Sequence, residues 1–133
     1  MKRGLAAPPP SAALAVGLLE DGNRALFLSR VNALGQETVE LPCVLLQKGE
    51  NPVAALASEF RRQTGIDAQV HEILFERKTN VGSRKRKSFA PVLVFKITAK
   101  SASVRVAPEF SGYRWLERGD FEKYRRAKNC LWL

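Results

Sequence analysis

Apolar residues gather into short runs that are typical of β-strands. Residues 12–19 and 24–31 form one pair of runs, and Asp21-Gly22-Asn23 between them supplies a turn that tolerates positive φ. Residues 68–77 and 89–99 form a second pair around a basic loop and are rich in Val, Ile, Leu and Phe. The pattern therefore predicts two β-hairpins, one near the start of the chain and one in its second half.

Shorter elements are predicted between and after these pairs. Residues 32–38 show little periodicity and predict a loop, followed by short extended pieces at 39–41 and 45–46. Residues 112–117 contain two aromatic side chains and predict a last strand. Asp120 can then cap a short helix that begins near residue 121.

The clearest element is an amphipathic helix between Asn51 and Gly65. Asn51 is a good N-cap, Pro52 suits the first helical position because its missing N–H is not needed there, and Gly65 can adopt the left-handed conformation that ends a helix. Apolar residues at i, i+3, i+4 and i+7 predict a stripe toward the core, formed by Val53, Leu56, Ala57 and Phe60. The other face, which is either plain surface or a site, carries Ala55, Ser58, Glu59 and Arg62.

Taken in order, these segments predict an α/β fold in which helices pack against a mixed sheet. A length of 133 residues corresponds to one domain, which we place at 12–133. Residues 1–11 are interrupted by Pro8-Pro9-Pro10 and predict a flexible N-terminal arm rather than a signal peptide. No apolar run approaches the roughly 20 residues needed to cross a bilayer, so we expect a cytoplasmic protein without a membrane partner.

Charge is the unusual part of the composition. Twenty-two Lys and Arg against 13 Asp and Glu give a net charge of +9, which favours anionic partners such as nucleotides, nucleic acid or acidic lipid. Cys43 and Cys130 are far apart in the sequence and His71 is the single histidine. A Cys/His metal site is therefore not expected.

The segment 41–66 resembles the box of the Nudix hydrolase family, usually written G-x5-E-x7-R-E-U-x-E-E-x-G-U, where U is a bulky aliphatic residue. In an ungapped register its first glutamate falls on Glu50, its second on Glu59, and its closing pair on Gly65-Ile66. The flanking strands agree with the family over nearly the whole chain. The resemblance implies a Nudix-like α/β/α sandwich with a central mixed β-sheet, and MutT-like hydrolysis of phosphorylated ligands with Mg²⁺ as cofactor.

Four positions depart from the family pattern. Val44 stands in place of the opening glycine and Ser58 in place of the arginine, while Arg62 and Gln63 replace a pair of glutamates. In the family, these glutamates and the one at Glu59 hold divalent cations over a pyrophosphate. A guanidinium in their place repels a divalent cation, so these residues argue against Mg²⁺ binding of the family type.

The first hypothesis is therefore a Nudix-fold protein with a degenerate box, which binds nucleotides or other diphosphate ligands with weak or no hydrolysis. Its candidate phosphate-binding residues are Arg62, Gln63 and Ser58, because a guanidinium offers two parallel donors to a phosphate. The alternative for Arg62 is a solvated helix residue that pairs with Glu59 at i−3.

The second hypothesis keeps an active, divalent-metal-dependent hydrolase of nucleoside diphosphates linked to another group. Glu59 would be its metal ligand or catalytic base, and Glu50 and Glu109 its auxiliary catalytic or metal-binding carboxylates. Glu109 enters through a loose correspondence, since family members often carry such a glutamate a few residues before a late tryptophan, here Trp115.

The third hypothesis is a nucleic-acid or macromolecule-binding module. Its residues are Arg84, Lys85, Arg86 and Lys87, with Arg61, Arg62, Arg125 and Arg126 as further candidates. Consecutive cations at a hairpin tip can contact phosphates and release counterions, which predicts steeply salt-dependent binding. The alternative is a solvated loop that keeps the protein soluble, and no RNA-recognition aromatic motif or zinc knuckle accompanies these charges.

Overall fold

The computed structural model describes residues 13–80, 82–127 and 130, so the predicted arm at 1–11 lies outside the described residues. Strand and helix bounds lie within a few residues of those expected up to residue 117. No helix in the described part of the chain is both long enough and apolar enough to span a membrane. The elements are β1 (Ala13–Asp21), β2 (Arg24–Val31), β3 (Glu37–Glu40), β4 (Cys43–Leu46), α1 (Pro52–Thr64), β5 (Gln69–Asn80), β6 (Phe89–Thr98), β7 (Gly112–Glu117), η2 (Arg118–Lys123) and β8 (Arg125–Arg126).

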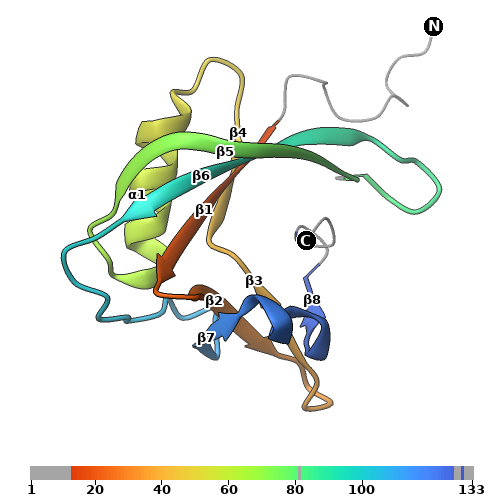
Figure 1. The fold of residues 1–133 in the computed structure, drawn as a ribbon. Coiled ribbons are helices and arrows are strands. Elements are labelled where there is room, and N and C mark those ends of the chain that lie inside the picture. The colour runs from red at the N-terminus through yellow and green to blue at the C-terminus, as the bar shows by residue number, and fades with distance from the viewer. Residues whose placement is uncertain (1–12, 81, 128–129, 131–133) are drawn as a thin grey trace, which may run out of the picture.

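The strands form one strongly curled mixed sheet with α1 against one side (Figure 1). Their order is β5-β6-β1-β2-β3-β8, while β4 pairs with β1 and β7 pairs with β2. β1 and β6 run parallel, as do β3 and β8, and the other pairs are antiparallel. The predicted α/β fold with a mixed sheet is therefore confirmed.

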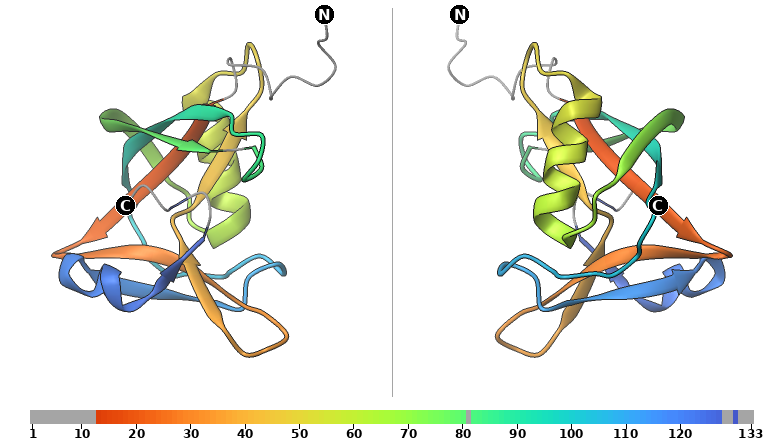
Figure 2. Two further views of the ribbon diagram at one scale, coloured as in Figure 1. Left: turned by 90° about the vertical axis from the view of Figure 1, so that its right-hand side faces the viewer. Right: turned by 90° about the vertical axis from the view of Figure 1, so that its left-hand side faces the viewer.

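The first predicted hairpin pairs only beside its turn. Glu20 pairs with Ala25 and Asp21 with Arg24, and beyond these pairs β1 and β2 diverge. β1 joins β4 and β6, whereas β2 joins β3 and β7. Figure 2 shows β1 running from the upper strands down to this turn, below which β2 and β7 lie. The divergence curls the sheet around an apolar core.

The second predicted hairpin is confirmed along its whole length. β5 and β6 are antiparallel from the pair Gln69 and Thr98 to the pair Asn80 and Phe89, with irregular register near Ile73. The loop that joins the two strands lies at the end farthest from α1 in Figure 1. Its basic side chains are therefore carried away from the helix.

The caps of α1 are also as predicted. The Asn51 side chain accepts hydrogen bonds from the N–H groups of Val53 and Ala54, and Gly65 has a φ of +74° and donates its N–H to the Arg61 carbonyl. Leu56 and Phe60 are fully buried, but Val53 is 42% exposed, so the predicted apolar stripe is wrong at its first member. Burial is confined to the later turns of the helix, where the buried residues are Leu56, Phe60, Gln63 and Thr64.

The C-terminal region differs from the prediction. The expected short helix is a 3-10 helix, η2, which begins at Arg118 without a side-chain cap, and Asp120 accepts a hydrogen bond from Lys123 instead. The chain then forms β8 beside β3, so β7 is not the last strand. The Phe121 ring packs edge-on against Phe27 with centroids 4.9 Å apart. This tertiary contact fixes η2, whereas the prediction rested on local capping preference alone.

Candidate functional site

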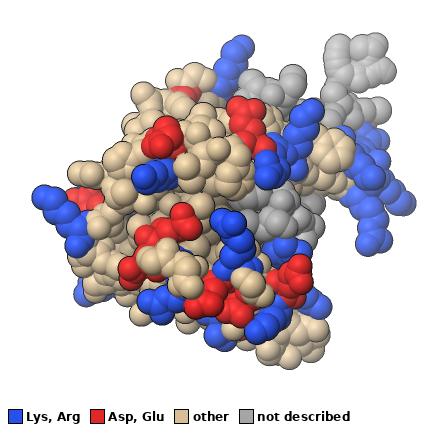
Figure 3. Space-filling model, viewed as in Figure 1, with Lys and Arg blue, Asp and Glu red and all other residues tan. Residues whose placement is uncertain are grey.

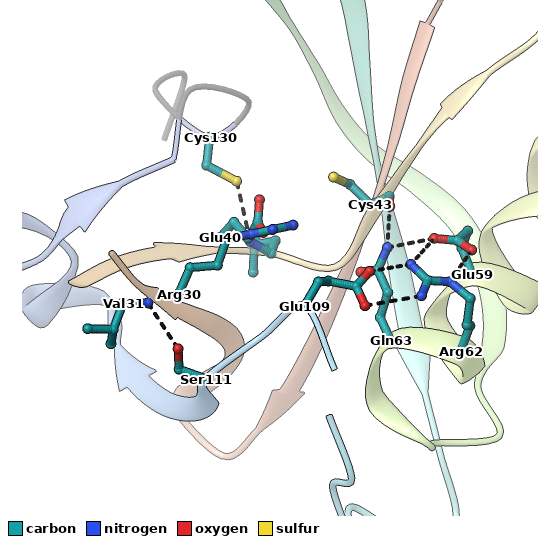
Figure 4. A network of polar contacts seen from close by, with 11 residues as sticks. Arg30, Val31, Glu40, Cys43, Glu59, Arg62, Gln63, Glu109, Ser111 and Cys130 are labelled. Carbon is teal, nitrogen blue, oxygen red and sulfur yellow. Dashed lines mark hydrogen bonds and ion pairs between the residues drawn. The ribbon is translucent and has the colours of Figure 1, made fainter. Parts of the chain in front are cut away.

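Four predicted site residues meet beside the later turns of α1, as Figure 4 shows. At their centre is the Arg62 guanidinium. Its Nε donates to Glu59 Oε1 at 2.7 Å and its Nη2 donates to Glu59 Oε2 at 3.2 Å. Its Nη1 and Nη2 also donate to the two oxygens of Glu109, at 3.3 and 2.6 Å. We name the four residues the Arg62 cluster: Glu59, Arg62, Gln63 and Glu109.

Gln63 anchors the cluster to the sheet. Its side chain is buried, with 7% of the residue exposed. The amide Nε2 donates to the Cys43 carbonyl at 2.9 Å and to Glu59 Oε2 at 2.8 Å. The amide therefore bridges β4 and the carboxylate, and both of its partners are acceptors.

The segment after β6 places Glu109 against the helix. The N–H of Arg105 donates to the Thr64 carbonyl at 2.8 Å, and the N–H of Ala107 donates to the Gln63 carbonyl at 3.0 Å. These bonds satisfy carbonyls that the end of a helix otherwise leaves without partners. A Cβ on Gly65 would lie 3.2 Å from Arg105 Cβ. The closing glycine of the family pattern thus serves both the left-handed cap and the close approach of this segment.

The cluster is electrostatically coupled. Hydrogen bonds from Arg62 are the main reason that the pKa values of the Glu59 and Glu109 carboxyls lie below their ordinary value, with some desolvation acting against this. The same hydrogen bonds, first from Glu109 and then from Glu59, raise the pKa of Arg62 above its ordinary value. Both carboxylates and the guanidinium are therefore charged at neutral pH.

This arrangement does not fit a divalent metal ion. The carboxylate oxygens of Glu59 and Glu109 already accept N–H groups from Arg62, whose positive charge lies where a second cation would be repelled. Among the residues that the structure describes, no group of three or more His, Cys, Asp or Glu side chains is placed to hold a metal. Mg²⁺ would need Arg62 to move aside.

Ser58 and Glu50 lie near the cluster but outside its hydrogen bonds. Together with Glu59 they line an open depression of about 560 Å³ beside the first turns of α1. Glu50 Oε1 accepts the N–H of Gln47 at 2.6 Å, so this carboxylate closes a local turn. The residues lining this depression and the Arg62 cluster thus form two adjoining groups that share Glu59.

A cavity of about 500 Å³ holds functional candidates that sequence reasoning missed. Apolar side chains from several strands and η2 form most of its wall, and Arg77 and Arg118 supply cations. The Arg77 guanidinium lies 4.6 Å from the centre of the Phe75 ring. No sequence motif marks these residues, because they come from elements that meet only in the fold. The lining residues are Leu18, Glu20, Asn23, Ala25, Leu41, Phe75, Arg77, Val94, Leu116, Arg118 and Phe121.

The basic residues Arg84, Lys85, Arg86 and Lys87 do not belong to the Arg62 cluster. They are exposed on the loop between β5 and β6, at the opposite side of the molecule from α1 in Figure 1. Any role of these residues is therefore separate from that of the cluster.

Comparison with known proteins gives the class of this fold. Residues 8–131 match the NUDIX domain family, so the chain belongs to this family. Members of this family typically use a divalent metal. No curated protein matches the sequence.

Solved structures agree with the family assignment. The E. coli ORF135 protein has a TM-score of 0.70 at 16% identity, covering 87% of this chain and 80% of that chain. The MutT protein from Methanosarcina mazei Go1 has a TM-score of 0.65 at 19% identity, covering 84% and 80%. An ADP-ribose pyrophosphatase from Streptococcus suis has a TM-score of 0.64 at 9% identity, covering 89% and 81%. These likenesses show that the fold is the predicted Nudix α/β/α sandwich.

Proposed function

We propose that this protein binds nucleotides or other small molecules containing a diphosphate, and that its degenerate Nudix box hydrolyses them weakly or not at all. One observation carries the proposal: the Arg62 guanidinium lies between the carboxylates of Glu59 and Glu109. Arg62 stands at a position where the family pattern has a glutamate. A fixed cation therefore takes the place that a bound metal has in relatives.

Arg62 keeps one N–H donor, on Nη1, for an anion. A guanidinium has five N–H groups, and the bonds to the two carboxylates use four of them. The Arg62 side chain is half exposed, and the Glu109 side chain is 33% exposed. A phosphate oxygen can therefore replace Glu109 at Nη1 and Nη2, while Glu59 continues to hold Nε and fix the orientation of the plane.

The cavity that contains Arg77 and Arg118 supports a ligand with both apolar and anionic parts. Its wall includes Phe121, against which an apolar part of a ligand can pack, and the two arginines can pair with phosphates. Apolar walls with a few placed polar groups are typical of small-molecule sites. The S. suis protein that shares the fold is named an ADP-ribose pyrophosphatase, and ADP-ribose contains a diphosphate.

Calorimetric titration of the purified protein with ADP-ribose and with nucleoside di- and triphosphates tests the proposal. We expect binding in EDTA that added Mg²⁺ does not strengthen. Arg62→Ala should weaken binding by about tenfold or more, because hydrogen bonds to a charged phosphate are lost. Arg61→Ala removes a neighbouring exposed charge from the same helix and should leave the affinity unchanged. Binding that requires Mg²⁺ would contradict the proposal.

The same titration separates this proposal from an active hydrolase. The hydrolase would need Arg62 to leave Glu59 free for a metal, with Glu50 and Ser58 in the adjoining depression. In that case Mg²⁺ would strengthen binding, nucleotide turnover would follow, and Glu59→Gln would abolish it.

A further inference from the structure

We propose that the loop joining β5 and β6 binds single-stranded nucleic acid, with its cations on the phosphates and the ring of Phe89 against a base. The proposal does not depend on the ligand proposed above, because the loop lies apart from the Arg62 cluster. It rests on the distribution of charge, on the internal bonding of the loop and on the exposure of one aromatic ring.

The net charge of the protein is located in one segment. Residues 77–108 contain nine basic residues (Lys and Arg) and no acidic residue. The other 101 residues contain 13 basic and 13 acidic residues (Asp and Glu), so their charges cancel. Six of the nine are on the loop or on the adjoining end of β5: Arg77, Lys78, Arg84, Lys85, Arg86 and Lys87. Figure 3 shows Lys and Arg gathered at the right-hand end of the molecule, where this loop lies in Figure 1. Such a surface attracts a polyanion.

The loop is folded rather than extended. Asn80 Oδ1 accepts the N–H groups of Gly82 and Ser88, both at 2.9 Å, so one side chain ties the two ends together. Ser83 and Arg86 close the tip, where the Ser83 N–H donates to the Arg86 carbonyl at 3.0 Å. A Cβ on Gly82 would lie 2.2 Å from the Arg86 carbonyl oxygen, so this backbone contact requires glycine. The cations are therefore presented from a compact turn.

The side chains at the tip favour nucleic acid over a bilayer. The segment 82–88 has the sequence GSRKRKS, with no apolar residue to enter a membrane. Phe89 follows at once and is 59% exposed, so its ring is available to a base. Cationic grooves combined with exposed aromatic rings are typical of proteins that bind single strands without sequence preference.

Fluorescence anisotropy with labelled single-stranded RNA and DNA, measured from low to moderate KCl, tests the role of the charges. The loop variant combines three substitutions at the tip: Arg84→Gln, Lys85→Gln and Lys87→Gln. The matched control removes three exposed charges elsewhere on the protein: Arg24→Gln, Lys48→Gln and Lys123→Gln. The slope of log affinity against log salt should fall by about 2 in the loop variant. The control should keep the wild-type slope. Equal slopes in the two variants would overturn the proposal.

A second measurement tests the aromatic contact. Phe89→Ala should weaken oligonucleotide binding by about fivefold or more, because a stacked base loses its partner. The same variant should bind inorganic polyphosphate as the wild type does. If Phe89→Ala lowers the affinity for oligonucleotide and for polyphosphate equally, or lowers neither, the assignment to nucleic acid is overturned. Binding to phosphatidylserine vesicles without binding to oligonucleotides would do the same and would assign the loop to membranes.

Discussion

Two groups of basic residues in this protein differ in what surrounds them. Arg62 lies between two carboxylates that accept four of its hydrogen bonds, with a buried glutamine holding one of those carboxylates. The cations of the β5–β6 loop belong to a segment of 32 residues that contains no acidic residue. The first group is ion-paired within the fold, whereas the second lies in a stretch of sequence with an excess of positive charge.

This difference shows that the kind of residue does not decide the function of a cation. Arg62 is paired with two carboxylates and set on a helix, and in our proposal it replaces a bound ion at a defined point. The loop cations are exposed and numerous, and in our proposal they act through their summed field. Variants that change these surroundings should separate the two proposed roles.

Restoring the family pattern should have the largest effect. The variant Ser58→Arg, Arg62→Glu, Gln63→Glu removes the guanidinium and supplies the missing carboxylates. With Mg²⁺, we expect hydrolysis of a nucleotide from a panel that includes ADP-ribose to rise by about 10²-fold or more, as a bound metal stabilises the charge that develops on phosphate.

Adding Glu59→Gln to this variant is the control, because it keeps the other three changes and should remove the new activity. The loop residues are untouched, so binding of oligonucleotides should stay as in the wild type. Wild-type protein that is already as fast as the restored variant would contradict the account.

Gln63→Glu alone should destabilise the fold. The Gln63 amide donates to the Cys43 carbonyl and to Glu59, and a carboxylate there would face two acceptors in a buried position. We expect a loss of about 1–3 kcal/mol in the free energy of unfolding, measured with urea in EDTA at pH 7. Gln69→Glu makes the same change at an exposed position and should cost less than about 0.5 kcal/mol.

Arg62→Ala should change how stability depends on pH. Arg62 lowers the pKa values of Glu59 and Glu109 from the ordinary 4.5, so their contribution is fully present above about pH 4.5 and is lost as the pH falls through their folded-state values. The wild type should therefore lose more stability than Arg62→Ala between neutral pH and acid. Arg61→Ala should give a curve parallel to that of the wild type. Parallel curves for both variants would show that the ion pairs do not stabilise the fold.

Neutralising the loop should have the smallest effect on the folded protein. The loop variant with glutamine at 84, 85 and 87 changes exposed side chains, whereas the bonds that fix the loop come from Asn80 and Ser83. Its free energy of unfolding should stay within about 0.5 kcal/mol of the wild type. A larger loss would mean that these charges serve the fold and not a partner.

Sequence alone predicted the elements whose causes are local. The ends of α1 follow from Asn51 and Gly65, which act on backbone groups within a few residues. The long β5–β6 hairpin follows from two apolar runs around one loop. The i, i+3 spacing on the helix also predicted that Arg62 could pair with Glu59, and the structure shows this pair.

Features that depend on distant partners could not be predicted in this way. Glu109 reaches Arg62 across 47 residues, because the segment after β6 bonds to the end of α1. The divergence of β1 from β2 depends on the strands that each one meets next. Phe75 packs against the core and also lines a cavity, and that cavity could not be predicted because its wall comes from both halves of the chain.

Binding of Mn²⁺, followed by the loss of the free-ion signal in electron paramagnetic resonance, tests most directly whether Arg62 stands in for a metal. Arg62→Glu, Gln63→Glu should bind the ion, since Glu59 and two new carboxylates then face it. The wild type should leave the signal of the free ion unchanged. Wild-type protein that binds Mn²⁺ as tightly as this variant, and loses that binding on Glu59→Gln, would contradict the account.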